Sequence, residues 1–290
     1  MSEAEPMRTA AAEFRDSQRE AWTSVAGAWK NWWRIFESGA QRVNDVLVER
    51  SSTKFAGRAL DVATGIGEPS LTVARAVGPE GSVLAVDLSP GMLEHAADRA
   101  RECDVTNIEF VEADAQEIEL EPASFDSATS RWGLMLMQDP ALAIARVHGA
   151  LKPESRFAAA VWAPPEQAPF LALARSVLTR ELDLPPIDVA EPGPFGLSTE
   201  GALDGLLEAG GFEDVARELV PVHTEFESAD EYLTCTREMS SSFRKQIAEL
   251  DAATVERLLT AIRAEAQTHA GADGRIRFES LTWVVSGRRA

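Results

Sequence analysis

The clearest hydrophobic pattern in the chain lies between Arg58 and Asp87, where two apolar runs flank a glycine-bearing turn and a short amphipathic segment. The run ALDVA over residues 59–63 is typical of a strand buried on both faces. Residues 70–77 carry apolar side chains at helical spacing, and VLAV over residues 83–86 predicts a second strand that ends at Asp87. The pattern therefore predicts a β-α-β unit with an acidic residue at the tip of its second strand.

The turn inside this unit has the features of a site for an adenosine-containing ligand. Glycines at a strand-to-helix turn let a ligand approach the backbone, and the helix start offers unpaired N–H groups. Asp87 follows Gly65 and Gly67 by about 20 residues, the spacing at which a carboxylate accepts both ribose hydroxyls. The turn lacks the Gly-Lys-Ser/Thr ending of a phosphate loop, and Ala63 replaces the first glycine of a dinucleotide fingerprint. NAD, FAD and other adenosine ligands stay open here, as does a plain βαβ turn with a chance aspartate.

The rest of the chain alternates between helical and extended patterns. We expect strands at 108–111, 125–130, 157–161, 215–226 and 274–285, and helices near 90–102, 140–151, 170–182, 200–209, 229–250 and 252–270. This alternation predicts an α/β fold with a doubly wound, mostly parallel sheet. The last strand region must pair antiparallel, because no crossover connection follows it.

The N-terminal part combines helical spacing with aromatic density. We expect an irregular segment up to about Asp16, a helix from Ser17, and a second helix over 41–49. Two overlapping helical stripes hold most of the tryptophans: Trp22, Ala26, Trp29 and Trp33, and beside them Val25, Trp29, Trp32 and Phe36. Packing accounts for any single one, but together they could close over a ligand, and aromatic faces attract a cation where water is excluded. We therefore treat residues 1–50 as a helical lid on a domain spanning 51–290.

Composition narrows the range of partners. The chain has 290 residues, with 28 basic and 47 acidic side chains and a net charge of −19. Such a balance disfavours nucleic acid and anionic membrane surfaces as partners. The two cysteines, Cys103 and Cys235, lack metal-ligand spacing and suit a reducing cytoplasm. We expect no metal, no membrane insertion, and an oligomeric state that the sequence leaves open.

Five stretches together resemble motifs of the class I S-adenosylmethionine-dependent methyltransferases, in particular the ubiquinone/menaquinone-biosynthesis-like branch. They are LDVATGIGEPSLTVA, AVDLSPGML, VEADAQEI, FDSATSRWGLMLMQDP and ARVHGALKPESRFAAAVW. The resemblance covers roughly residues 22–162 well and 196–287 more loosely. Ala63-Thr64 departs from the more usual Gly-Cys of the first motif, and Glu154-Ser155 from the usual Gly-Gly after Lys-Pro. The resemblance implies a Rossmann-like seven-stranded sheet with an antiparallel strand beside the fifth, and helical insertions at about 164–197 and 227–272.

The same resemblance implies roles for individual residues. S-adenosylmethionine would be the cofactor, held by Asp61, Ala63, Gly65, Gly67, Asp87, Leu88, Met92, Asp114, Ala115, Ser130 and Arg131. Within that set, the Asp114-Ala115 pair at a strand end could read an adenine, although a solvated turn aspartate is the alternative from the residues alone. The acceptor would lie against Trp29, Trp32, Trp33, Trp132, Met135 and Trp162.

These observations favour a methyltransferase acting on a small, largely apolar or aromatic acceptor, such as a quinone or polyketide. Transfer from a sulfonium disperses charge, so alignment and desolvation can supply most of the rate acceleration. A base is needed only if the acceptor must lose a proton, and the candidates are His223 and Tyr232. Two alternatives are an NAD(P)-dependent Rossmann oxidoreductase and a non-catalytic relative that binds the cofactor.

Overall fold

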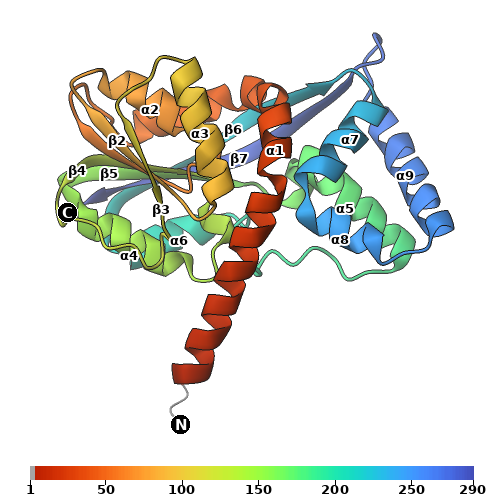
Figure 1. The fold of residues 1–290 in the computed structure, drawn as a ribbon, viewed down its shortest axis with the longest axis horizontal. Helices are drawn as coiled ribbons and strands as arrows, with labels where there is room; N and C mark the ends of the chain where they lie inside the picture. Colours follow the sequence, from red (N-terminus) through yellow and green to blue (C-terminus); the bar gives the residue numbers. More distant parts are fainter. Residues whose placement is uncertain (1–3) are drawn as a thin grey trace.

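The computed structural model describes residues 4–290, and within them seven strands form one sheet in the order β3-β2-β1-β4-β5-β7-β6 (Figure 1). The strands are β1 (Arg58–Val62), β2 (Ser82–Asp87), β3 (Ile108–Glu112), β4 (Phe125–Arg131), β5 (Leu151–Trp162), β6 (Phe212–Phe226) and β7 (Ile276–Arg289). β7 lies between β5 and β6 and is antiparallel to both. This confirms the doubly wound fold and the antiparallel strand beside the fifth.

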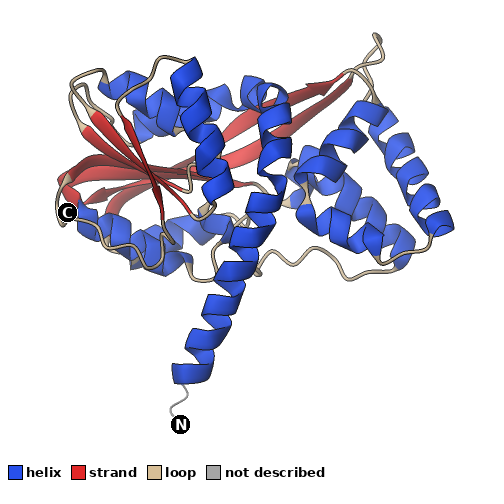
Figure 2. Ribbon diagram, in the orientation of Figure 1, coloured by secondary structure: helices blue, strands red, loops and turns tan. Residues whose placement is uncertain are grey.

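Helices cover both faces of the sheet, which appears as a single layer between them in Figure 2. They are α1 (Ala4–Arg50), α2 (Ser70–Val77), α3 (Pro90–Glu102), α4 (Pro140–Ala150), α5 (Pro169–Leu182), α6 (Ala202–Ala209), α7 (Ala229–Met239), α8 (Ser241–Ala248) and α9 (Ala252–Gln267), with short 3-10 turns at Leu134–Leu136 and Pro165–Gln167. In Figure 1, α2 and α3 lie on one side of the sheet and α4 and α6 on the other, while α5, α7, α8 and α9 gather at the far end beside β6 and β7.

Two helix boundaries differ from the sequence expectation. The N-terminal segment is one helix from Ala4 to Arg50, where we expected an irregular start and a break near residue 40. The helix continues through Gly39, where a Cβ would stand 1.7 Å from the carbonyl oxygen of His223 on β6, so the contact between α1 and β6 requires glycine. Conversely, the helix expected over 229–250 is interrupted at Ser240, whose side chain accepts a hydrogen bond from the Phe243 N–H and caps α8.

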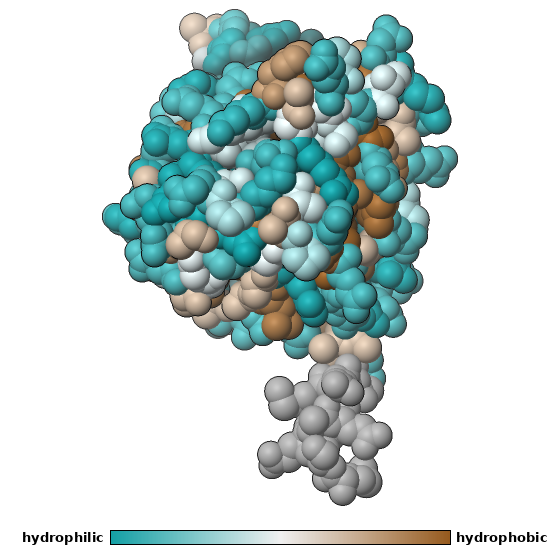
Figure 3. Space-filling model, turned by 90° about the vertical axis from the view of Figure 1, so that its left-hand side faces the viewer, coloured by the Kyte–Doolittle hydropathy of each residue, from teal (hydrophilic) through white to brown (hydrophobic). Residues whose placement is uncertain are grey.

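The core lies between the sheet and its covering helices. Residues 59–62 of β1 are all buried, as expected for a strand covered on both faces. The main core also contains Phe36, Ala40, Val43 and Leu47 of α1, so the N-terminal helix shares one core with the sheet. Hydrophilic residues dominate the face of the molecule seen in Figure 3, in keeping with the net charge of −19. Within residues 4–290, no helix combines the length and apolar character that crossing a membrane requires.

Candidate cofactor and acceptor site

The glycine turn follows β1 and is held by backbone hydrogen bonds. The Thr64 N–H donates to the Val86 carbonyl at 3.0 Å, and the Gly67 N–H donates to the Thr64 carbonyl at 3.0 Å. Gly67 has a φ of +105°, and a Cβ there would lie 3.4 Å from Ala96 of α3. Ala63 adopts the left-handed φ of +59° despite its side chain. Gly67 thus serves the packing of α3, whereas Ala63 and Gly65 are partly exposed at the strand tip.

Asp87 joins the glycine turn to the start of α3. Its carboxylate accepts the Gly65 N–H at 2.8 Å and the Ser89 N–H at 2.9 Å. Burial raises the pKa of Asp87 to about 6, against the opposing effect of these hydrogen bonds. An ionised carboxylate has about four acceptor positions, so two remain for other donors. The side chain is half-buried at the strand tip, where a ribose could reach it.

The Asp61 side chain is fully buried. Its carboxylate accepts the Ser70 hydroxyl at 2.6 Å and the Thr129 hydroxyl at 2.9 Å, and the residue has no exposed surface. Burial raises its pKa, and the hydroxyl donors oppose that shift. In the described structure Asp61 ties β1 to α2 and β4, and its expected contact with a cofactor stays a prediction.

The proposed adenine side is formed by the tips of β2 and β3, which pair in register at Asp87 and Glu112. The Asp114 carboxylate accepts the Gln116 N–H at 2.9 Å, so the geometry is also compatible with the alternative that Asp114 is a solvated turn aspartate. Ala115 is buried and Leu88 half-buried, while Met92 is only 3% exposed beneath Val25 and Ala26 of α1. The structure brings these residues together, with Met92 covered by the N-terminal helix.

Residues 15–44 of α1, which we call the α1 strap, cross the turns that follow β1, β2, β3 and β4. Polar contacts fix the strap along its length: Arg15 with Glu117 (2.6 Å), Thr23 with Ser89 (3.0 Å), Lys30 with Asp98 (3.0 Å), Glu37 with Arg131 (2.5 Å) and Asn44 with Arg131 (2.8 Å). Glu117, Ser89 and Arg131 lie in motifs expected to bind the cofactor, and Asp98 lies on α3, the helix that begins in the same motif as Ser89. The strap therefore forms the outer wall of the candidate site.

An aromatic cluster lies where the strap meets β4 and β5. Trp132 and Trp162 stack with ring centroids 4.3 Å apart and planes 6° from parallel. Phe36 meets Trp132 edge-on at 5.2 Å, and Trp29 meets Phe36 at 5.1 Å. The Trp132 indole N–H donates to the Thr282 hydroxyl at 2.9 Å, a partner from β7 that the sequence did not reveal. Trp29, Trp132 and Trp162 thus belong to one continuous aromatic cluster, with Phe36 between Trp29 and Trp132.

The remaining residues expected to bind the acceptor are divided among neighbouring elements. Met135 is buried in the same core as Trp132. The Trp32 indole N–H donates to Glu238 of α7 at 2.6 Å. Trp33 instead carries the Arg99 guanidinium of α3 over its ring at 4.4 Å. Trp32 and Trp33 therefore attach the strap to its neighbours on either side.

A buried charge cluster completes the site. Arg131 donates to both carboxylate oxygens of Glu37, and Glu68 accepts from Thr72 with Arg99 at 3.7 Å. Burial lowers the pKa of Arg131, but the carboxylates of Glu37, Glu68 and Asp61 together raise it above its ordinary value. For Glu68, burial and the Glu37 charge raise the pKa. With Asp61 and Asp87, whose partners are hydroxyls and backbone N–H groups, this region holds four carboxylates and two guanidiniums. The cluster therefore favours a cationic ligand over an anionic one.

Sequence reasoning missed Glu37, Asn44, Glu68 and Arg99 of this cluster. One signal was available: Glu37 and Asn44 are seven residues apart, so they lie on one face of a helix. That face is otherwise the apolar one of α1, and polar residues on a buried face indicate buried partners.

Two buried polar atoms at the site have no hydrogen-bond partner among the described residues: the Ser130 hydroxyl and the Trp29 indole nitrogen. Ser130 is 1% exposed. Its oxygen lies 3.2 Å from where a Cβ of Gly133 would stand, and the Ala63 Cβ lies 2.3 Å from that same point. Buried polar groups are usually satisfied, so the expected partner of each atom is a water molecule or a ligand. The Ser130 hydroxyl marks a point between the tips of β1 and β4.

The two candidate bases lie apart from this point. His223 is on β6 with its side chain 65% exposed, and its Nδ1 is 3.7 Å from the Glu279 carboxylate. Tyr232 is fully buried, its hydroxyl donates to the Phe170 carbonyl at 3.1 Å, and burial raises its pKa. Neither side chain contacts Trp132: Tyr232 packs on Phe170, which in turn packs on Phe36 with ring centroids 6.0 Å apart.

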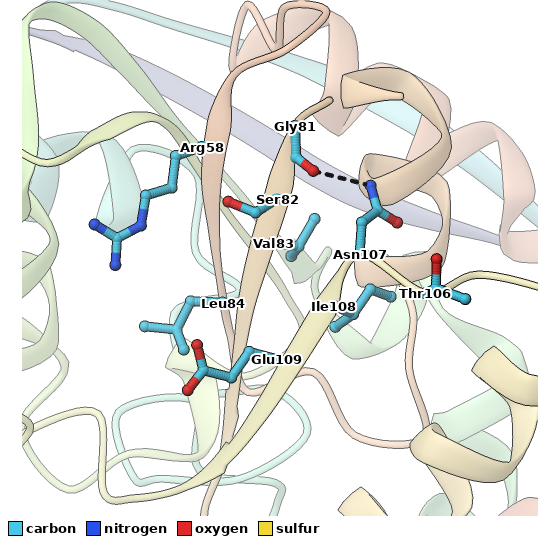
Figure 4. A pocket seen from close by; sticks show the side chains of 9 residues that line it. All are labelled: Arg58, Gly81, Ser82, Val83, Leu84, Thr106, Asn107, Ile108 and Glu109. Atoms are coloured by element: carbon cyan, nitrogen blue, oxygen red, sulfur yellow. Dashed lines mark hydrogen bonds between the residues drawn. The ribbon is translucent and has the colours of Figure 1, made fainter. Parts of the chain in front are cut away.

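A hollow of about 270 Å³ lies at the opposite end of the sheet (Figure 4). It is lined by the first residues of three strands, Arg58, Ser82 and Ile108, together with neighbouring residues. Asn107 donates there to the carbonyls of Ala74, Gly78 and Gly81, which joins the amino ends of the strands. Ligands of such sheets bind at the carboxyl ends, so this hollow is separate from the candidate site.

Comparison with known proteins identifies the class to which this fold and site belong. The family described as "Methyltransferase domain" matches residues 59–154. A ubiquinone/menaquinone biosynthesis C-methyltransferase UbiE of Ectopseudomonas oleovorans is 32% identical over 139 residues, which cover 47% of this chain and 82% of that protein. The chain belongs to the class I S-adenosylmethionine-dependent methyltransferases. It spans about half the length of other curated relatives that it matches, such as 54% of UbiE from Pseudomonas putida strain F1.

Solved structures share the fold at lower identity. Phosphoethanolamine N-methyltransferase 2 of Haemonchus contortus, in complex with S-adenosyl-L-methionine, has a TM-score of 0.59 at 21% identity, covering 96% of this chain and 60% of that one. The YcgJ protein of Bacillus subtilis has a TM-score of 0.55 at 17% identity, covering 86% and 98%. The [4+2]-cyclase SpnF has a TM-score of 0.53 at 18% identity, covering 93% and 97%. These likenesses establish the fold alone.

Proposed function

We propose that this protein is an enzyme that transfers a methyl group from S-adenosylmethionine to a small, largely apolar or aromatic acceptor. The observation that carries the proposal is the buried, carboxylate-rich cluster at the carboxyl ends of β1, β2 and β4. S-adenosylmethionine carries a sulfonium and an ammonium, which this cluster would attract. The pyrophosphate of NAD would have to be buried beside Asp61, Asp87 and Glu68, which disfavours a dinucleotide.

The residues present fit this cofactor. Asp87 would accept the ribose hydroxyls, and Asp114 with the Ala115 N–H would meet the adenine edge. Ala63, Gly65 and Ser130 would line the methionine end, where the Ser130 hydroxyl lacks a partner among the described residues. When bound there, the cofactor supplies an electrophilic methyl group.

The chain's own contribution would be alignment and the exclusion of water. The strap and the stacked Trp132 and Trp162 give the acceptor side a dry aromatic wall. In-line transfer to an aligned acceptor draws on positioning and desolvation more than on proton transfer. The proposal assigns no base, because Tyr232 is buried with its hydroxyl already donating and His223 points to solvent.

The test of activity is a screen of quinone, phenol and polyketide acceptors with S-adenosylmethionine labelled by deuterium in its methyl group. Mass spectrometry would reveal the labelled methyl on the product and the atom that carries it. Labelled product would support the enzyme. Cofactor binding without any labelled product across the three acceptor classes would instead favour a non-catalytic relative.

A further inference from the structure

A second hollow, of about 540 Å³, opens between α7 and α8 beside α1. We call it the α7–α8 groove. Its lining consists of Thr234, Arg237, Glu238, Arg244, Ile247 and Ala248. Sites for small organic molecules typically have volumes of about 300–1,000 Å³, so the groove is large enough for one.

The groove concentrates positive charge in a strongly acidic protein. Neither Arg237 nor Arg244 has a carboxylate oxygen within 4.0 Å in the described part of the chain, and Arg244 donates only to the Ser24 hydroxyl at 3.3 Å. Glu238 is the one acidic residue of the lining, and its carboxylate already accepts the Trp32 indole N–H at 2.6 Å. In a chain of net charge −19, an anion is repelled over most of the surface and attracted here. Guanidinium groups also match the geometry of carboxylates and phosphates.

Aromatic side chains of α1 lie between the groove and the candidate site. Ile247 and Ala248 give the groove an apolar side. Trp32, bonded to Glu238, lies one helical turn before Phe36 on the same face of α1, a rise of about 6 Å. Phe36 in turn packs edge-on against Trp132 and Trp162, at 5.2 and 6.4 Å. The side chains between the groove and the aromatic cluster are therefore apolar, as an elongated apolar acceptor would require.

We propose that the α7–α8 groove binds the anionic headgroup, a carboxylate or a phosphate, of an apolar small molecule, and that this molecule is the methyl acceptor. Arg237 and Arg244 hold the headgroup, while the apolar body lies along α1 toward Trp132. The identification of the ligand as acceptor rests on the proposed function. The binding of an anionic apolar molecule in the groove does not.

Calorimetric titration of the full chain tests the groove with four probes: 2-naphthoate, 2-naphthyl phosphate, the neutral 2-naphthamide and inorganic phosphate. At about 0.15 M salt, where remote charges are screened, at least one naphthyl anion should bind about fivefold or more tightly than 2-naphthamide. Arg237→Gln and Arg244→Gln should each remove most of that preference. Lys245→Gln, which removes a charge on α8 outside the lining, should keep it. The preferred anion identifies the headgroup.

Three results would overturn the proposal that the α7–α8 groove binds an anionic apolar molecule. They are no preference for either naphthyl anion, a preference that survives both arginine substitutions, and inorganic phosphate binding as tightly as 2-naphthyl phosphate. S-adenosylmethionine affinity, measured in every variant, should stay within twofold of wild type and shows that the fold is intact. A wild-type protein that fails to bind S-adenosylmethionine would contradict the proposed function and leave the result on the groove standing.

Discussion

Arg131 at the end of β4 and Glu37 in α1 form a buried, two-point ion pair, with nitrogen–oxygen distances of 2.5 and 2.7 Å across 94 residues of sequence. Their side chains are only 6% and 8% exposed. Arg131 directly follows Ser130 on β4, so the pair fixes the strap beside Ser130. The position of α1 and the shape of the candidate site therefore depend on each other.

Breaking this pair should be costly. Glu37→Gln leaves the Arg131 charge buried without its partner, and we expect the free energy of unfolding to fall by about 3–5 kcal/mol. Chemical denaturation measures it. Glu37→Leu combined with Arg131→Met should recover much of the loss, because no unpaired charge is then buried. Lys30→Gln, which breaks the exposed strap contact with Asp98, should cost about 1 kcal/mol or less. A Glu37→Gln variant as stable as the Lys30→Gln variant would contradict the role of the pair.

Asp87→Asn should weaken S-adenosylmethionine binding by about 1.5–3 kcal/mol, the range for hydrogen bonds to a charged group. Calorimetry measures the affinity. The stability of the variant at pH 7 should stay close to that of wild type, because removing a buried charge offsets the loss of one of the two N–H bonds, which an amide nitrogen cannot accept. Unchanged affinity together with a collapsed melting temperature would make Asp87 structural.

Asp87 should also give the protein a specific pH dependence. Burial raises its pKa to about 6, above the unfolded value of about 3.9. The folded state therefore holds this proton more tightly, and the stability of Asp87→Asn relative to wild type should rise between about pH 4 and about pH 6 and change little outside that range. Wild-type cofactor affinity should fall as the pH drops through about 6, since the ionised carboxylate is the acceptor. Two results together would contradict this role of Asp87: the same pH dependence of the free energy of unfolding in wild type and Asp87→Asn, and a wild-type cofactor affinity that does not change between about pH 7.5 and 5.

Ser130→Ala separates ligand binding from folding. The Ser130 hydroxyl is buried without a partner among the described residues, so its removal should leave stability unchanged or slightly higher. S-adenosylmethionine affinity or turnover should nevertheless fall by about 1 kcal/mol, one neutral hydrogen bond. Thr129→Val is the matched control, because that hydroxyl donates to Asp61 and its loss should lower stability. Ser130→Ala with unchanged binding and turnover would mean that no ligand uses this hydroxyl.

Two glycines of α1 should respond oppositely to alanine. Gly27 has nothing within 4 Å of an added Cβ, so Gly27→Ala should stabilise the protein by about 0.5–1 kcal/mol. Gly39→Ala would place a methyl 1.7 Å from the His223 carbonyl oxygen and should destabilise by about 1–3 kcal/mol through overpacking. Thermal unfolding of both variants measures the difference. Equal shifts would contradict the close approach of α1 to β6.

The sequence predicts features that neighbouring residues determine, and it does not predict contacts between residues far apart along the chain. The β-α-β unit over residues 58–87 is encoded by neighbouring residues, and its bounds match the pattern closely. The sequence around Gly39 does not reveal why glycine is needed there, because the His223 carbonyl that approaches it lies far away along the chain. The pairing of Glu37 with Arg131 depends on how a 47-residue helix crosses the sheet, and no local pattern specifies that crossing.

The most direct measurement is a calorimetric titration of the intact chain with S-adenosylmethionine and, separately, with NAD. We predict saturable 1:1 binding of S-adenosylmethionine and no detectable heat with NAD, because the carboxylates around Asp61 and Glu68 favour a cation and oppose a pyrophosphate. Binding of NAD in the absence of S-adenosylmethionine binding would contradict the account.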